Sequence, residues 1–80
     1  MTRIVDRKAT GERIRKLREE RGISVRELQR HPDLNLASHQ AVYKWQVGKN
    51  VPCIDHLLIL CEIFDVEITD IIVTKDSNDR

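Results

Sequence analysis

The sequence predicts a small all-α domain, and three observations support this. Apolar residues recur at helical spacing in several short segments, as Ile14 and Leu17 do in the first of them. Residues that end helices separate these segments, namely Gly22, Pro32 and Gly48. No segment alternates between apolar and polar residues as a strand does. We therefore expect a compact bundle of five short helices around one core.

Length and composition allow one domain. Of the 80 residues, 40% are hydrophobic and 34% are charged, which is enough for a thin core but leaves no room for a separate catalytic domain. The longest apolar run, residues 57–61, is far too short to span a membrane. The N-terminus lacks the apolar core of a signal peptide, so a cytoplasmic location is expected.

The first helix is expected from Thr10 to Arg21, with a start as early as Asp6 as the alternative. Gly22 is well placed to end it in a left-handed conformation. The second helix is expected to begin after Ser24 as N-cap and to stop before Pro32.

A turn over residues 32–37 follows, and its Leu34 and Leu36 are expected to pack against the core. Ser38 is expected to cap the third helix, which runs to Gly48. Val42 and Trp45 lie three residues apart in this helix, which predicts that both are buried.

Pro52 precedes the fourth helix, expected from Cys53 to Phe64, and a short fifth helix is expected from Ile68 to Val73. The buried stripe of the fourth helix is predicted to consist of Ile54, Leu57, Leu58, Cys61 and Phe64. Residues 10–73 would then form the domain. Residues 1–9 would be an N-terminal arm or helix extension, and residues 74–80 a polar, frayed tail.

The net charge of +1 hides a strong polarity along the chain. Residues 1–30 carry ten Lys or Arg and five Asp or Glu, whereas residues 51–80 carry two basic and seven acidic residues. A basic front and an acidic back orient a domain toward a polyanion, although exposed charge is more often merely solvated surface.

No motif predicts a metal, a cofactor or an enzyme. Cys53, His56 and Cys61 have the spacing of metal ligands, but a fourth ligand is missing and Cys61 is expected to be buried. The two cysteines are also too far apart along one helix to form a disulfide. Ser24 and Ser38 are accounted for as helix caps, and no base accompanies either as a nucleophile requires.

The motifs that carry a resemblance stand in a fixed order: Gly11-Glu12-Arg13-Ile14-Arg15-Lys16-Leu17-Arg18, Gly22-Ile23-Ser24, Glu27-Leu28, Val42-Tyr43-Lys44-Trp45, Gly48-Lys49, Pro52 and Phe64-Asp65-Val66. No single motif is specific. Their order and spacing over residues 9–73 resemble the Cro/cI-type (lambda-repressor-like, XRE) helix-turn-helix family. The resemblance implies a five-helix fold whose second and third helices bind DNA, the third in the major groove.

Site residues follow from the resemblance by position. Those implied to face the DNA bases are His39, Gln40, Tyr43 and Lys44. Those implied to contact phosphates are Arg13, Ser24, Ser38, Lys49 and Asn50, and two further phosphate contacts, Arg26 and Asn35, are expected where the chain departs from the family pattern. Two departures from the family pattern matter. Val25 stands where members often carry a Gln that touches the DNA backbone and braces the third helix, and the turn before that helix is longer than usual.

The sequence therefore predicts a sequence-specific DNA-binding transcriptional regulator, most simply a repressor that occupies a two-fold operator. Its expected partners are double-stranded DNA and a second copy of the chain, since one such module is small for tight discrimination. The alternative is an antitoxin or adaptor that uses the same fold mainly to bind a protein, such as a toxin or an anti-repressor. The acidic, apolar-rich segment from Glu62 to Val73 would serve that partner.

Overall fold

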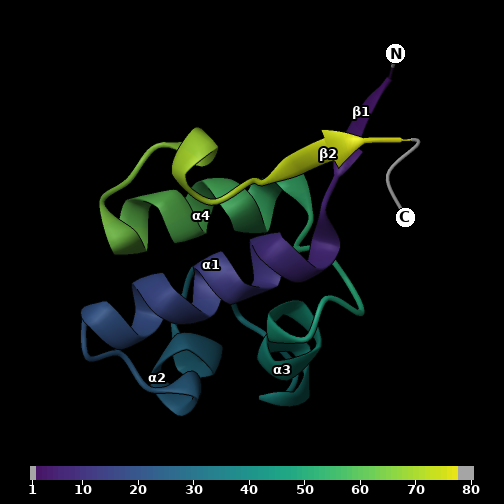
Figure 1. The fold of residues 1–80 in the computed structure, drawn as a ribbon. Coiled ribbons are helices and arrows are strands. Elements are labelled where there is room, and N and C mark those ends of the chain that lie inside the picture. Colours follow the sequence, from purple (N-terminus) through teal and green to yellow (C-terminus); the bar gives the residue numbers. More distant parts are fainter. Residues whose placement is uncertain (1, 78–80) are drawn as a thin grey trace.

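Residues 2–77, which the computed structural model describes, form four α-helices, one 3-10 helix and a two-stranded sheet. Their order is β1 (Arg3–Val5), α1 (Arg7–Glu20), α2 (Val25–Arg30), α3 (Gln40–Gln46), α4 (Ile54–Phe64), η1 (Ile68–Asp70) and β2 (Thr74–Asp76). Helix α1 crosses the middle of the molecule, with α4 on one side and α2 and α3 on the other (Figure 1). The mostly helical fold is confirmed. The expected fifth helix is only the 3-10 helix η1, so the count of five α-helices is not confirmed.

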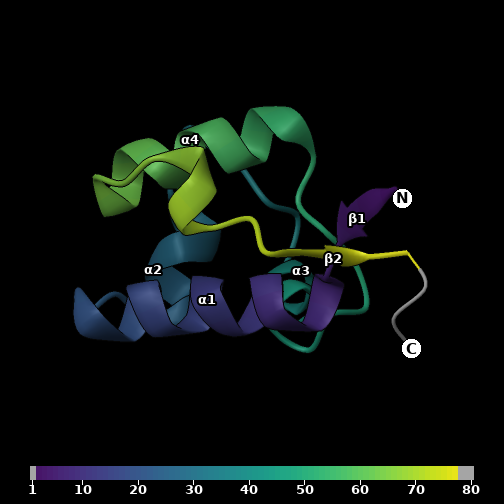
Figure 2. The same cartoon turned by 45° about the horizontal axis from the view of Figure 1, so that its top comes forward.

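The two ends of the described chain form a small antiparallel sheet, which corrects the all-α prediction. Arg3 pairs with Asp76 and Val5 with Thr74. The Arg3 guanidinium also donates to the Thr74 carbonyl oxygen over 2.9 Å. Both strands lie together at one end of the molecule (Figure 2). The segment from Thr74 to Asp76 is therefore a strand and not a frayed tail, and the expectation for residues 78–80 lies outside the described residues.

Helix α1 begins at Arg7, earlier than Thr10, because Asp6 caps it. The Asp6 carboxylate accepts a hydrogen bond from the Ala9 N–H over 3.0 Å. The buried Thr10 hydroxyl ties this helix to the segment before β2, accepting from the Val73 N–H over 3.0 Å and donating to the Val73 carbonyl over 3.3 Å. Residues 7–9 are therefore an extension of α1, the second of the two expected alternatives for this segment.

Gly22 ends α1 as predicted. Its φ of +66° is left-handed, and the Ile23 N–H donates back to the Arg18 carbonyl over 3.0 Å. This is the Schellman arrangement that glycine favours. The chain thus reverses direction immediately before the Ser24 cap of α2.

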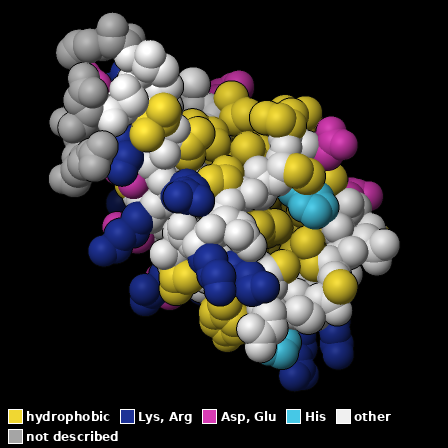
Figure 3. Space-filling model, turned by 90° about the vertical axis from the view of Figure 1, so that its right-hand side faces the viewer, with side chains coloured by type: hydrophobic (Ala, Val, Ile, Leu, Met, Phe, Trp, Pro, Cys, Tyr) yellow, Lys and Arg dark blue, Asp and Glu magenta, His cyan; other side chains and the backbone are white. Residues whose placement is uncertain are grey.

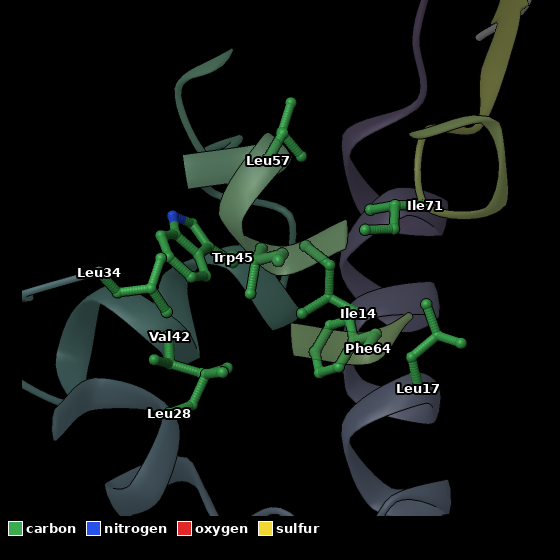
Figure 4. Packing of buried hydrophobic residues seen from close by; sticks show 10 residues of the cluster. Ile14, Leu17, Leu28, Leu34, Val42, Trp45, Leu57, Phe64 and Ile71 are labelled. Atoms are coloured by element: carbon green, nitrogen blue, oxygen red, sulfur yellow. The ribbon is translucent and has the colours of Figure 1, made fainter. Parts of the chain in front are cut away.

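The core gathers side chains from all four α-helices, the turn before α3 and the segment after η1. Figure 4 shows Leu28, Leu34 and Val42 grouped on the α2–α3 side and Ile14 beside Phe64 on the α1 side. The buried hydrophobic residues are Ile14, Leu17, Leu28, Leu34, Val42, Trp45, Leu57, Leu60, Phe64 and Ile71. The predicted burial of Ile14, Leu17, Val42 and Trp45 is confirmed.

The buried stripe of α4 differs from the predicted one. Leu57, Leu60 and Phe64 are buried, whereas Ile54 is 65% exposed and Leu58 is 52% exposed. The helix is apolar on most of its circumference, so several stripes of helical spacing fit the sequence equally well. Only the placement of α4 against α1 decides which side chains face inward.

Candidate nucleic-acid interface

Helix α2 is short and fixed at both ends by local chemistry. The Ser24 hydroxyl accepts from the Glu27 N–H over 3.0 Å, and the Glu27 carboxylate accepts from the Ser24 N–H over 3.1 Å. This capping box satisfies two backbone donors that the helix itself leaves free. Leu28 anchors the helix in the core, and the helix ends at Arg30, before Pro32, as predicted.

The long turn between α2 and α3 is packed against the domain. Leu34 is 2% exposed and Leu36 packs on the core, as predicted. The Gln29 side-chain amide of α2 donates to the Leu36 carbonyl over 3.0 Å, which ties the turn to the helix before it. Asn35 takes a left-handed conformation with φ of +47°, a conformation that Asn tolerates better than most residues. These contacts set the position from which α3 starts.

Helix α3 is held from one side only. Val42 and Trp45 are buried, and the helix stops at Gly48, whose φ of +80° allows the Lys49 N–H to reach back to the Lys44 carbonyl over 3.0 Å. The N-cap is His39 and no side chain caps it, so the expected Ser38 hydroxyl cap is wrong. The first turn instead uses the backbone carbonyls of residues 38 and 39.

Two residues of α1 brace α3 and were not singled out from the sequence. A Cβ at Gly11 would overlap the carbonyl oxygens of Trp45 and Gln46, so only glycine allows this close approach of the two helices. The Arg18 guanidinium donates to the Gln46 side-chain oxygen over 3.0 Å and to the Ile23 carbonyl over 2.9 Å. In the sequence Arg18 is one of several arginines, and nothing local marks it as the inward one.

The outer face of α3 carries the predicted base-contacting side chains, all of which are exposed: His39, Gln40, Tyr43 and Lys44. The rings of His39 and Tyr43 contact each other edge to face, with 5.9 Å between their centroids and an angle of 88° between their planes. Tyr43 remains 49% exposed. The helix therefore offers a polar face with one oriented aromatic pair at its beginning.

The predicted phosphate contacts, with one exception, lie at the start of α2 or in the segments that flank α3. Ser24 and Arg26 are at the start of α2, Ser38 precedes α3, and Lys49 and Asn50 follow it. These residues and Asn35 in the turn are exposed. Because no side chain caps α3, the Ser38 hydroxyl is not needed for capping.

Arg13 is the exception. Its guanidinium donates to the Asp70 carbonyl in η1 over 2.9 Å. Lys16, Glu20 and Val66 line the same shallow groove, between α1 and the segment around η1. The structure thus places Arg13 beside η1, and it does not bring it together with the residues of α2 and α3.

A shallow cleft lies between α2 and α3. Its lining consists of Val25, Arg26, Gln29, His39 and Tyr43. Three of these, Arg26, His39 and Tyr43, are predicted site residues. Val25 and Gln29 complete the cleft, and the sequence marked Val25 only as a departure from the family pattern.

The two cysteines, Cys53 and Cys61, do not line this cleft. Both are free thiols, and burial raises the pKa of Cys61, with the carboxylates of Glu67 and Asp70 raising it further. A raised pKa keeps this thiol protonated, whereas a metal ligand must be a thiolate. Within residues 2–77, no group of three or more His, Cys, Asp or Glu side chains is placed to hold a metal ion. None of the described helices is long and apolar enough to cross a membrane.

A capped short helix, a turn packed on the core and a second helix with an exposed polar face define a helix-turn-helix domain. A family model described as the Cro/C1-type HTH DNA-binding domain matches residues 13–77. Because that match covers most of the chain, the protein belongs to the Cro/C1-type family of helix-turn-helix DNA-binding domains.

Comparison with solved structures shows the same fold elsewhere. The restriction-modification controller protein C.AhdI from Aeromonas hydrophila is similar with a TM-score of 0.70 and 24% identity. The similarity covers 82% of this chain and 96% of that chain. A search of curated proteins found no match.

Proposed function

We propose that this protein is a sequence-specific transcriptional regulator that represses by occupying a two-fold DNA operator, with α3 in the major groove. The observation that carries the proposal is the two-sided character of α3. Val42 and Trp45 fix its inner side, and the polar side chains at its start are exposed. That is the end of a recognition helix that meets base edges.

The exposed side chains have suitable chemistry for base edges. The Gln40 amide matches the N6 and N7 edge of adenine, and Lys44 suits guanine O6 and N7 or a phosphate oxygen. His39 and Tyr43 stand at the same end of α3 with their rings fixed against each other. Each good bidentate contact discriminates against a wrong base by about 1–3 kcal/mol.

Phosphate contacts would orient the domain on the duplex. Arg26 and Lys49 supply charge on either side of α3, and Ser24, Asn35, Ser38 and Asn50 supply neutral polar groups. Arg13 is not included in this set because its guanidinium is bound to η1. The acidic C-terminal third of the sequence lies mainly in α4 and the segments after it, which face away from α2 across α1 (Figure 1).

A two-fold operator requires two copies of the chain. One module of this size covers about 600–1,000 Å² on DNA, which is small for tight discrimination. The surface after Gly48 offers apolar side chains for a second copy, since Ile54 and Leu58 of α4 are exposed and Val47 nearby in sequence is 69% exposed. Figure 3 shows hydrophobic side chains gathered over one part of the surface, with Lys and Arg beside them.

The rival reading, an adaptor for a protein partner, receives less support. It depends on the apolar side chains of the segment from Glu62 to Val73. The structure describes all of these residues, and none of the large hydrophobic side chains among them is exposed. Phe64 and Ile71 are buried, and most of the others are partly buried against the core, namely Ile63, Val66, Ile68 and Ile72. This segment stabilises the fold and offers a partner little apolar surface.

The proposal is tested by comparing Gln40→Ala and Lys44→Ala with Lys16→Ala in duplex binding. Lys16 is an exposed lysine of α1, so its substitution changes the charge equally but away from α3. Gln40→Ala is expected to weaken binding of the preferred sequence by about 1–3 kcal/mol and to relax the preference at one position. Lys44→Ala is expected to weaken binding or to lower the salt slope by about one charge, and Lys16→Ala to do neither. Unchanged affinity and sequence preference in both α3 variants would exclude α3 as the reading element.

A further inference from the structure

The cleft between α2 and α3 is lined by one aliphatic side chain, that of Val25, among polar and aromatic ones. Val25 is partly buried and packs on the core, while Arg26, Gln29, His39 and Tyr43 stand around it. Within the proposed interface, the cleft lies between a phosphate-contacting residue, Arg26, and two base-contacting residues. A base or phosphate that contacts the N-terminal end of α3 would therefore lie next to the cleft.

Part of the cleft wall is held by contacts within the protein. The Gln29 amide is held by the Leu36 carbonyl, and the His39 ring stands edge-on to the Tyr43 ring. Val25 is β-branched, and a β-branched side chain in a helix has one strongly preferred rotamer. A preformed cleft discriminates by shape because little ordering is needed when it is filled.

A base edge in the major groove offers one apolar group, the C5-methyl of thymine. We propose that this cleft takes the methyl group of one thymine in each half-site, in contact with the Val25 side chain. The inference rests on the proposed function and specifies what α2 adds to it. The neighbouring O4 atom of thymine is an acceptor, and the rim supplies a donor in the His39 imidazole. A cytosine at that position has no methyl group to occupy the apolar part of the cleft.

Deoxyuridine in place of thymidine removes the methyl and keeps the base pair. The wild-type protein is expected to bind a selected operator about fourfold more weakly when the critical thymine of a half-site is replaced, which is the value for one buried methyl group. Val25→Ala removes the side-chain atoms that would contact the methyl group. The ratio of the affinities for the thymine and uracil operators is then expected to fall to about one. Val5→Ala removes the same atoms from β1, outside the cleft, and is expected to keep the fourfold ratio.

The experiment measures dissociation constants of the three proteins for the operator and for each single thymine-to-uracil replacement. The ratio for one protein is unaffected by any loss of folded material, since both DNAs are bound by the same preparation. No uracil-sensitive position in the wild type, or the same sensitivity in Val25→Ala, would overturn the inference while leaving sequence-specific binding intact. Failure to select any operator would overturn both the inference and the proposed function.

Discussion

Gly11→Ala is expected to destabilise the domain although alanine is the better helix former. In an ordinary helix interior this change stabilises by about 0.5–1 kcal/mol. Here the added Cβ would overlap the Trp45 carbonyl oxygen and lie 2.8 Å from that of Gln46. Both atoms are backbone, so they move only if α1 and α3 separate.

The size of the effect follows from setting the overlap against the gain in helix propensity. Overpacking of this kind costs about 1–3 kcal/mol and occasionally more, and overlap with two backbone groups belongs at the upper end. After the propensity gain is subtracted, the expected loss is about 2 kcal/mol. Gly22→Ala is the matched control, because a Cβ there meets nothing within 4 Å and only the φ of +66° opposes it. Its cost is about 1 kcal/mol.

Urea unfolding followed by Trp45 fluorescence measures both variants, because Trp45 is the single tryptophan of the sequence and is 5% exposed. With a slope of about 1 kcal/mol per molar urea, Gly11→Ala is expected to lower the midpoint by about 2 M. Gly22→Ala is expected to lower it by about half as much. A midpoint for Gly11→Ala equal to or above that of the wild type would refute the close packing of α1 on α3.

Two further predictions concern the hydrogen bonds of Thr10 with Val73 and the pKa of the Cys61 thiol. Thr10→Val keeps the shape of the side chain but leaves the Val73 N–H without its acceptor, which is expected to cost about 1–3 kcal/mol. Thr10→Ser keeps the hydroxyl and should cost less, about 0.8 kcal/mol for one methyl. Equal losses in thermal or urea unfolding would argue against the hydrogen bond. Because the pKa of Cys61 is raised in the folded chain, ionisation of this thiol is expected to leave the stability unchanged below about pH 9. It is expected to lower the stability as the pH rises further. Cys61→Ala should reduce that fall, and an unchanged pH profile of the urea midpoint would contradict the shift.

Local chemistry made much of the fold predictable. Ser24 with Glu27, Gly22 and Pro32 act within a few residues of their own position, so their roles follow from the sequence alone. The packing of Leu34 was also predictable, because two large apolar side chains in a turn need a core to cover them.

The features that the sequence did not predict depend on segments far apart in the chain. Strands β1 and β2 are three residues each and pair only because the fold brings both ends together. The stripe of α4 was misplaced because the helix is apolar on most sides. The place of Arg13 depends on where η1 lies, and the cleft beneath Tyr43 depends on the position of α3 relative to Val25.

Sequence-specific recognition of DNA by α3 can be tested by selecting binding sites from random duplex DNA with the purified protein. The affinity is then followed against salt concentration. We expect an enriched two-fold motif whose half-sites lie about one helical turn, 10–10.5 base pairs, apart. Weak binding that falls steeply with salt and enriches no sequence would show that only phosphates are recognised. That result would contradict the assignment of α3 as a recognition helix.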